Sequence, residues 1–387
     1  RISIAYPAVV ACYPIYLHNM LVSTIFVRRM KRLTYILLAV PLCLYLALHI
    51  REAKPHATIL PEPSVRCDTV RLVFGGDLMQ HMPQVAAART ADGSYDYGRS
   101  FGHVAHIFRD ADIAVVNLET TLSTAGRYSG YPCFCSPVEV ADAMADMGID
   151  IAVMANNHCC DRLSRGIGST IEALDSRGIR HTGVFADSAD YARNNILRFE
   201  CGGIRFALIN YTYGTNGIPV PKDRIVNLID TTVISRDMAA VDRTATDCLI
   251  AVMHWGNEYE RHENAEQRRL ACMLRRKGAD IVIGSHPHVI QPFEADSTGA
   301  VFYSLGNLVS NQQRRYCDGG LIASIDVVRC DTLPQLQYIA SATPVWVLCP
   351  DYRILPPEVA DTLDMPAASR LRYQQFIEDT RSLIYKN

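Results

Sequence analysis

One recurring arrangement constrains the fold of this chain more than any other feature. Short apolar runs end in residues that can bind a metal or transfer a proton: residues 70–74 lead into Asp77, and residues 113–116 lead into Asn117 and Glu119. The residues that follow the later runs are Asn156, Asn157, His158, Asp161, His254, Trp255, Ser285, His286, His288 and Asn307. Short apolar runs separated by amphipathic stretches are typical of an α/β domain with mainly parallel strands.

The pattern predicts where the elements of this domain lie. Strands are expected at 70–74, 113–116, 149–154, 204–209, 248–253, 281–283, 301–305 and 321–328, and helices at 98–109, 138–147, 167–177 and 266–277, with an amphipathic tail after residue 366. Ligands of open α/β sheets bind at the carboxyl ends of the strands. We therefore expect the polar residues to converge on one crevice.

The residue types in this crevice indicate its chemistry. Carboxylate, amide and imidazole donors together suit Mn, Fe or Zn, and the absence of Cys argues against a structural zinc site. A bridging carboxylate with His and Asn on either side is typical of a two-metal hydrolytic centre. Taken singly, Asp77, His81 or Asn307 is explained by capping, surface exposure or a turn. Their joint occurrence at successive strand ends favours a site.

Other catalytic or binding motifs are absent from the sequence. Ser285 and Ser304 lack the Gly-x-Ser-x-Gly context of a nucleophile, and neither a dinucleotide-binding nor a Walker motif is present. Residues 51–387 carry 33 Lys and Arg against 40 Asp and Glu. An acidic body without a basic run between aromatic residues excludes general attraction to nucleic acid.

The first fifty residues differ from the rest in charge, because they contain five Lys and Arg and no Asp or Glu. Met30, Lys31 and Arg32 precede an apolar run to Leu48, which predicts an export signal. No small-x-small cleavage site follows it, which favours an uncleaved membrane anchor over a secreted form, with the body outside the cytoplasm. We expect an upstream extension or poorly defined hydrophobic segment at 1–29, the signal peptide or anchor at 30–50, a proline-containing linker at 51–65 and one domain at 66–387.

Thirteen cysteines are too few for a fold built on disulfides. Export permits disulfide bonds. Cys133 and Cys135 are candidates to form them, although the sequence defines no pairing. Cys159 and Cys160 are interpreted as buried neighbouring thiols, with metal ligation as the alternative.

Six ordered motifs between residues 70 and 328 resemble the bacterial capsule synthesis CapA family, also called the poly-γ-glutamate biosynthesis or PGA-cap family. They lie at 76–81, 117–119, 155–162, 254–259, 284–291 and 303–307. This family is similar to the calcineurin-like metallophosphoesterases. The resemblance implies a four-layer α/β/β/α sandwich of the metallophosphoesterase type, preceded here by the hydrophobic leader.

The resemblance also implies roles for individual residues. One or two divalent ions would be held by Asp77, Glu119, Asn157, His254, His286 and His288. His158 would protonate the leaving group with Asp161 beside it. The remaining motif residues are candidates for substrate binding: His81, Asn117, Asn156, Trp255, Glu258 and Asn307.

The function expected from this resemblance is the synthesis, export or trimming of an anionic capsule polymer of the poly-γ-glutamate type by metal-dependent hydrolysis or transfer. One alternative is a non-catalytic subunit that binds polymer or cation beside a membrane capsule synthase. Another is an extracytoplasmic metallophosphoesterase with a small-molecule substrate. The sequence shows no basic cluster around the motifs, which disfavours a highly charged phosphate substrate unless metals supply the positive charge.

Overall fold

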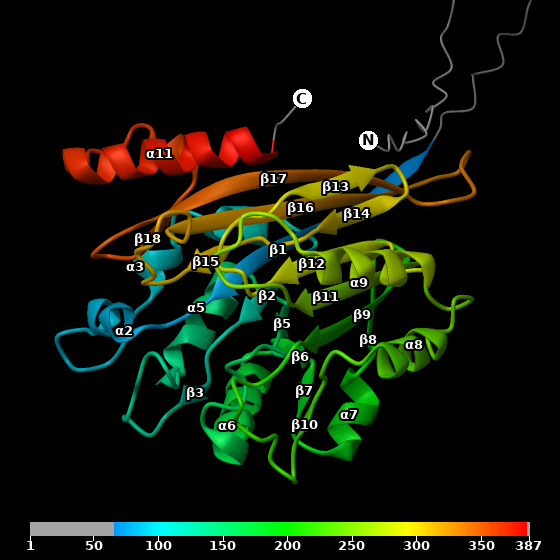
Figure 1. Ribbon diagram of the computed structural model, residues 1–387, viewed down its shortest axis with the longest axis horizontal. Helices are drawn as coiled ribbons and strands as arrows, with labels where there is room; N and C mark the ends of the chain where they lie inside the picture. The colour runs from blue at the N-terminus through cyan, green and yellow to red at the C-terminus, as the bar shows by residue number, and fades with distance from the viewer. Residues whose placement is uncertain (1–65, 385–387) are drawn as a thin grey trace, which may run out of the picture. The chain divides into compact units, whose positions relative to one another are not determined.

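The computed structural model describes residues 66–384, which belong to one compact unit (Figure 1). The segments expected at 1–29, 30–50 and 51–65 lie outside the described residues. Among residues 66–384, no helix combines the length and apolar character needed to cross a membrane.

The first sheet is mixed, with a parallel half and an antiparallel half on either side of its strand β1. Its strands, in spatial order, are β18 (Arg353–Leu355), β17 (Gln337–Leu348), β16 (Gly319–Cys330), β1 (Cys67–Leu78), β2 (Ile113–Leu118), β5 (Ile151–Val153) and β6 (Arg180–Thr182), and β15 (Asn307–Val309) also pairs with β1. Strands β2, β5, β6 and β15 run parallel to β1, whereas β16 to β18 form an antiparallel meander.

The second sheet has four parallel strands at its centre and one antiparallel strand at each edge. Its order is β13 (Phe293–Asp296), β14 (Gly299–Phe302), β12 (Ile281–Ser285), β11 (Cys248–His254), β9 (Ile204–Thr212) and β8 (Leu197–Cys201). Two short pairs, β3 (Leu122–Ser123) with β4 (Ser136–Pro137) and β7 (Val184–Phe185) with β10 (Ile225–Val226), lie apart from both sheets.

The two sheets share one apolar core. Leu72 and Phe74 of β1 belong to the same buried cluster as Ile250 and Val252 of β11. Alternate residues of a strand point to opposite faces, so Val73 of β1 belongs instead to the cluster on the other side of the first sheet. The sheets therefore pack face to face through their apolar inner faces.

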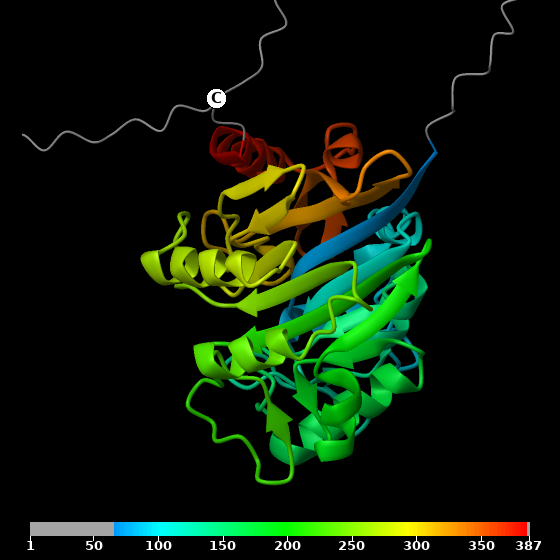
Figure 2. The same ribbon diagram turned by 90° about the vertical axis from the view of Figure 1, so that its right-hand side faces the viewer.

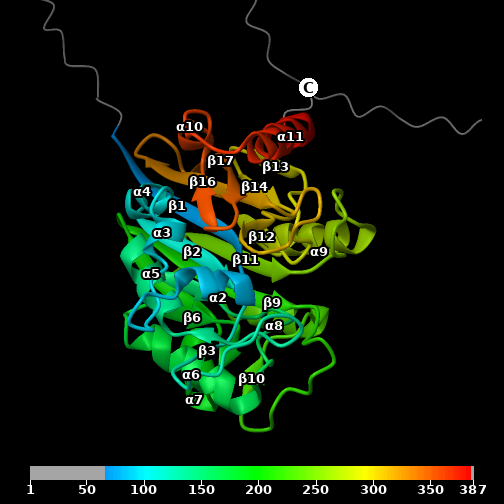
Figure 3. The ribbon, with the colours of Figure 1, turned by 90° about the vertical axis from the view of Figure 1, so that its left-hand side faces the viewer.

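Helices cover both outer faces. On the first sheet these are α3 (Gly98–Phe101), α4 (Ala105–Arg109), α5 (Glu139–Met147) and α6 (Leu163–Asp175), and on the second they are α8 (Thr231–Ala239) and α9 (Ala265–Arg276). Figure 3 shows α3, α4 and α5 on one side of the sheets and α9 on the other, and Figure 2 shows the second sheet with its helices. The order of layers is helix, sheet, sheet, helix, as the resemblance implied. The other helices are α2 (Met82–Ala88), α7 (Ser188–Asn194), α10 (Pro357–Ala360) and α11 (Ala367–Ile384).

The C-terminal helix α11 extends the core beyond the second sheet. Its Tyr373, Phe376 and Ile377 are buried with Trp346 of β17 in the inter-sheet cluster, and Figure 1 shows α11 along β17. The amphipathic tail predicted after residue 366 is thus a helix that covers the antiparallel half of the first sheet.

The mixed α/β class is confirmed, and the elements differ from the prediction in several places, because short elements such as β6, β8, β13 and β18 were also not predicted. The helix expected at 98–109 is two short helices separated by residues 102–104. The strand expected at 301–305 ends at Phe302, and the chain then crosses to the first sheet as β15. Strand β17 was not predicted.

The cysteine expectations are corrected in one respect. The disulfide joins Cys67, at the start of β1, to Cys330, at the end of β16, and these residues are neighbours in the antiparallel ladder. Cys133 and Cys135 are both free. Cys159 and Cys160 are buried free thiols, as interpreted.

Candidate metal centre

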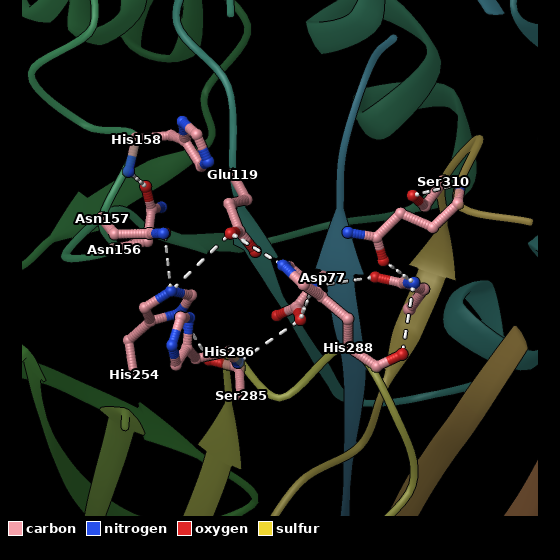
Figure 4. Close-up of polar contacts among 12 residues, drawn as sticks. Asp77, Glu119, Asn156, Asn157, His158, His254, Ser285, His286, His288 and Ser310 are labelled. Atoms are coloured by element: carbon pink, nitrogen blue, oxygen red, sulfur yellow. Dashed lines mark hydrogen bonds and ion pairs between the residues drawn. The ribbon is translucent and has the colours of Figure 1, made fainter. Parts of the chain in front are cut away.

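Polar side chains from both sheets meet at the carboxyl ends of the parallel strands (Figure 4). The first sheet contributes Asp77 and Asn117, which are partners in the β1–β2 ladder. The second sheet contributes His254 and Ser285, the last residues of β11 and β12. All four are buried. The convergence expected from the sequence is therefore present among the described residues.

Two histidines reach this point from a turn that follows β12. His286 and His288 both have left-handed backbone conformations, with φ of 99° and 57°, which are unfavourable for residues other than glycine. The turn brings the His286 amide to 3.3 Å and the His288 Nδ1 to 3.0 Å from the Asp77 Oδ2. The Asp77 carboxylate thus joins β1 to the histidine turn of the second sheet.

Glu119 lies at the centre of the group and is fully buried. Its Oε1 lies 3.7 Å from the His254 Nε2 and 3.8 Å from the His288 Nε2. Asn117 donates its Nδ2 hydrogen to the other carboxylate oxygen, Oε2, over 3.3 Å. Glu119 therefore faces imidazoles from two different strand ends.

Two overlapping sets of donor atoms share this carboxylate. Atoms of Glu119, His286 and His288 lie within 4.8 Å of one another, and so do atoms of Asp77, Glu119 and His254. The Asn157 Oδ1, 2.9 Å from the His254 Nε2, adds an amide oxygen beside the second set. The composition suits one or two ions of Mn, Fe or Zn.

Two buried atoms of these sets indicate that the residues fit a cation. The Glu119 Oε1 and the His286 Nδ1 have no hydrogen-bond partner. Buried polar atoms without partners are uncommon in folded proteins, because each costs about 1–3 kcal/mol. A divalent ion would satisfy both atoms.

The protonation equilibria of the group are strongly perturbed. Burial and the nearby Asp77 carboxylate raise the pKa of Glu119 well above its ordinary value. Burial and the neighbouring His286 and His288 lower the pKa of His254 far below its ordinary value, and burial lowers the pKa of His286 to about 3. The imidazoles of His254 and His286 are thereby kept in the neutral form that binds metals, and a cation would favour the ionised form of Glu119.

His158 and Asp161 form a separate pair next to the donor sets. The His158 Nδ1 lies 2.8 Å from the Asp161 Oδ2, and both side chains are buried. The Asn156 Oδ1 accepts a hydrogen bond of 3.1 Å from the His158 backbone amide. The Phe134 ring packs edge-on against His158, with the ring centroids 4.6 Å apart. The carboxylate and the ring together fix the orientation of the imidazole.

The residues predicted to bind substrate fall into different places. Asn117 and Asn156 form a buried amide chain in which the Asn156 Nδ2 donates to the Asn117 Oδ1 over 3.2 Å, and the Asn117 Nδ2 donates to Asp77 over 2.8 Å. His81 is half-buried and packs edge-on against Phe134, with the ring centroids 4.9 Å apart, and burial lowers its pKa to about 4. Glu258 is exposed, near enough to contribute to the raised pKa of Glu119.

Two of the predicted substrate residues have other contacts. Trp255 does not line the crevice: its indole is buried in the core between the second sheet and its helices, and its Nε1 donates to the Tyr303 carbonyl over 2.9 Å. It follows His254 directly, and neighbouring residues of a strand face opposite sides. The Asn307 Oδ1 lies 3.1 Å from the His288 Nδ1, and Asn307 is fully buried, so it positions that histidine.

The sequence reasoning missed two residues that follow β9. The ring of Tyr213 lies against His286, with the centroids 4.4 Å apart. The Asn216 Oδ1 accepts a hydrogen bond of 3.2 Å from the Asn157 Nδ2, and its own Nδ2 lies 3.5 Å from the His158 ring nitrogens. The strand was predicted to end at residue 209 but runs to Thr212, so the expected strand end did not lie next to Tyr213 and Asn216.

The described residues thus define a two-sheet α/β protein with a buried carboxylate, imidazole and amide centre at the ends of its strands. The family model described as bacterial capsule synthesis protein PGA_cap matches residues 71–312. The chain belongs to this family, as the motif resemblance predicted.

The chain is similar to two proteins from Bacillus. The PGA biosynthesis protein CapA of Bacillus subtilis (strain 168) is 28% identical over 251 residues, which cover 63% of this chain and 64% of the relative. The capsule biosynthesis protein CapA of Bacillus anthracis is 24% identical over 302 residues, covering 74% of this chain and 72% of the relative. A solved structure, the NAD nucleotidase of Haemophilus influenzae, is 10% identical with a TM-score of 0.45, covering 81% of this chain and 63% of that chain.

Proposed function

We propose that this protein acts on an anionic capsule polymer of the poly-γ-glutamate type by metal-dependent hydrolysis or transfer. The observation that supports the proposal most is the pair of donor sets that share Glu119, with the unpartnered Glu119 Oε1 between them. The names of the Bacillus relatives supply the biological context, which is biosynthesis of a capsule or of PGA.

The ligand set in this proposal combines both sheets. Asp77 and Glu119 from the first sheet and His254, His286 and His288 from the second would hold the ions, with Asn157 beside His254. Bound divalent ions would supply Lewis-acid polarisation of the substrate and would favour ionisation of water near neutral pH.

Proton donation in this proposal comes from an amino-acid side chain. His158, oriented by Asp161 through its Nδ1, would give a proton to the leaving group from its Nε2. Asn216 and Phe134 hold this imidazole from two further sides. Asn117 donates a hydrogen bond to the Asp77 carboxylate. Asn156 donates to the Leu118 carbonyl and accepts from the His158 backbone amide, so it fixes the backbone at both positions. This buried proton donor favours a catalytic role over the alternative of a subunit that only binds polymer.

We further propose that the protein works outside the cytoplasm, held at the membrane by its N-terminal segment and associated with subunits of a capsule synthase. The disulfide between Cys67 and Cys330 supports an oxidising compartment.

The proposal is tested on the full chain. Bound metal is measured by mass spectrometry, and hydrolysis is followed on γ-linked polyglutamate and on a generic phosphate ester. Glu119→Gln should lose both metal and polymer hydrolysis, whereas His158→Ala should keep the metal and lower kcat by about 100-fold or more. His106→Ala, which changes an exposed histidine of α4, is the control and should match the wild type.

Other outcomes of the metal and hydrolysis measurements support one of the two alternative functions or contradict the metal mechanism. Metal without turnover of either substrate supports the binding subunit, and turnover of the ester alone supports a phosphoesterase. Polymer hydrolysis that persists in Glu119→Gln contradicts the metal mechanism.

A further inference from the structure

A pocket with an unusual charge lies beside the proposed catalytic pair. It has a volume of about 200 Å³ and is lined by Arg127, Arg162 and Arg165, with no acidic residue in its lining. Among the ion pairs between described residues, none includes any of these three arginines. The body of the protein is acidic, so three guanidinium groups without a carboxylate partner in one pocket form a local excess of positive charge that would attract an anionic ligand.

The pocket is adjacent to His158 through the chain itself. Arg162 directly follows Asp161, which orients His158, and the lining residue Cys135 directly follows Phe134, which packs on the same imidazole. The two residues that orient His158, Asp161 and Phe134, are therefore each bonded directly to a residue of the pocket lining.

Local contacts shape this pocket. Arg162 donates a hydrogen bond to the Ser129 hydroxyl, and the backbones of Ser129 and Cys135 exchange hydrogen bonds of 2.9 and 2.8 Å. These bonds hold the loop that carries Arg127 against the start of α6, which lies beside β3 in Figure 1. Gly166 is required there, because a Cβ at this position would stand 2.3 Å from the Arg162 Cβ.

We propose that this arginine pocket binds a carboxylate of the polymer at a position next to the bond that reacts. The guanidinium group is planar and permanently charged, and it matches a carboxylate with two parallel hydrogen bonds. The assignment takes its ligand class from the proposed function. It also corrects the expectation that no basic cluster surrounds the motifs: Arg127 is distant in sequence from Arg162 and Arg165, and the fold brings it to them.

The test measures binding alone, on the full chain stripped of metal with EDTA. A fluorescent hexamer of γ-linked glutamate is titrated and its anisotropy recorded. The double variant Arg127→Gln/Arg165→Gln should bind about tenfold more weakly, which is about 1.4 kcal/mol, a loss that two exposed charged contacts can account for. Raising the salt concentration should weaken wild-type binding more than binding by the variant.

The matched control removes two positive charges elsewhere. Arg276→Gln/Lys277→Gln changes exposed residues at the end of α9, just before the amino end of β12 and so at the opposite end of the strands from the site. It should bind the hexamer as the wild type does. Circular dichroism and the Tm of both double variants should match the wild type, because all four residues are exposed.

Equal binding by the wild type and Arg127→Gln/Arg165→Gln overturns the proposal, as does equal binding of a neutral hexamer of γ-linked glutamine. Arginine-dependent binding of tripolyphosphate without binding of the glutamate hexamer would assign the pocket to phosphate and also overturns it. The measurement involves neither metal nor turnover. Failure of the hydrolysis experiment therefore leaves a positive binding result standing, and hydrolysis with arginine-independent binding refutes the pocket alone.

Discussion

Gly183, between β6 and β7, allows the motif at residues 155–162 to pack against the second sheet. The variant Gly183→Ala tests this arrangement. Gly183 has a φ of +90°, and a Cβ there would lie 2.1 Å from the Asn210 Oδ1 and 2.7 Å from the Ala155 Cβ. The same Asn210 Oδ1 accepts a hydrogen bond of 2.7 Å from the Ala155 amide, and the Asn210 Nδ2 donates to the Val252 carbonyl over 3.0 Å. Asn210 thus connects Ala155, the first residue of the motif at 155–162, to β11.

The expected cost of Gly183→Ala has three parts. A left-handed conformation costs a residue with a Cβ about 1–2 kcal/mol, and overfilling a packed site costs about 1–3 kcal/mol. Displacing Asn210 would leave the buried Ala155 amide without a partner, at about 1–3 kcal/mol. We expect a loss of about 5 kcal/mol in the free energy of unfolding.

Gly178→Ala is the matched control. Gly178 also has a left-handed φ, +72°, and a Cβ there would meet no atom within 4 Å. Its replacement should cost only the backbone part, about 1 kcal/mol. Urea unfolding of the wild type and both variants measures the difference. The reasoning is refuted if the free energies of unfolding of the two variants lie within about 1 kcal/mol of each other.

Two further predictions concern stability away from the centre. Burial disfavours the charge of Asp190, but hydrogen bonds, first that from His181, outweigh it and lower the pKa to about 2. Its contribution is therefore present above about pH 4 and lost as the pH falls toward 2, so the urea midpoints of the wild type and Asp190→Asn should differ at pH 6 and converge in acid; a constant difference contradicts this. The Cys67–Cys330 disulfide joins residues 263 apart in sequence, so replacing both with Ser should lower the free energy of unfolding by about 5 kcal/mol. Cys272→Ser, at an exposed free thiol, should leave the urea midpoint unchanged.

The sequence predicted the strand ends well because parallel strands place their carboxyl ends together wherever they lie in the sheet. Asp77, Glu119 and His254 were found by this rule alone, and the structure places them in one group. The rule uses the position of a residue along a strand and ignores the face toward which its side chain points. That is why Trp255 was assigned to the crevice although it is buried in the core on the other face.

Features that depend on long-range packing were not readable from local patterns. The pairing of Cys67 with Cys330 follows from the register of β1 against β16, which apolar runs do not define. Strand β17 was missed, and it contains Pro344, which removes a backbone donor from the ladder. Arg127 joins the arginine pocket only through the hydrogen bonds that close its loop.

The division of the donor residues between two sheets has a consequence for the order of folding during synthesis. Strands β8 to β14 all belong to the second sheet, except β10, which pairs with β7. Strands β15 to β18 come later in the chain and complete the first sheet. A growing chain therefore has β1 without its partners β15 and β16 until residues 307–330 have been made. Asp77 and Glu119 meet His286 and His288 only after both sheets have docked. Cation binding to the shared carboxylate would accordingly report the completion of folding, and a nascent chain that ends before residue 286 would lack the full set of donors.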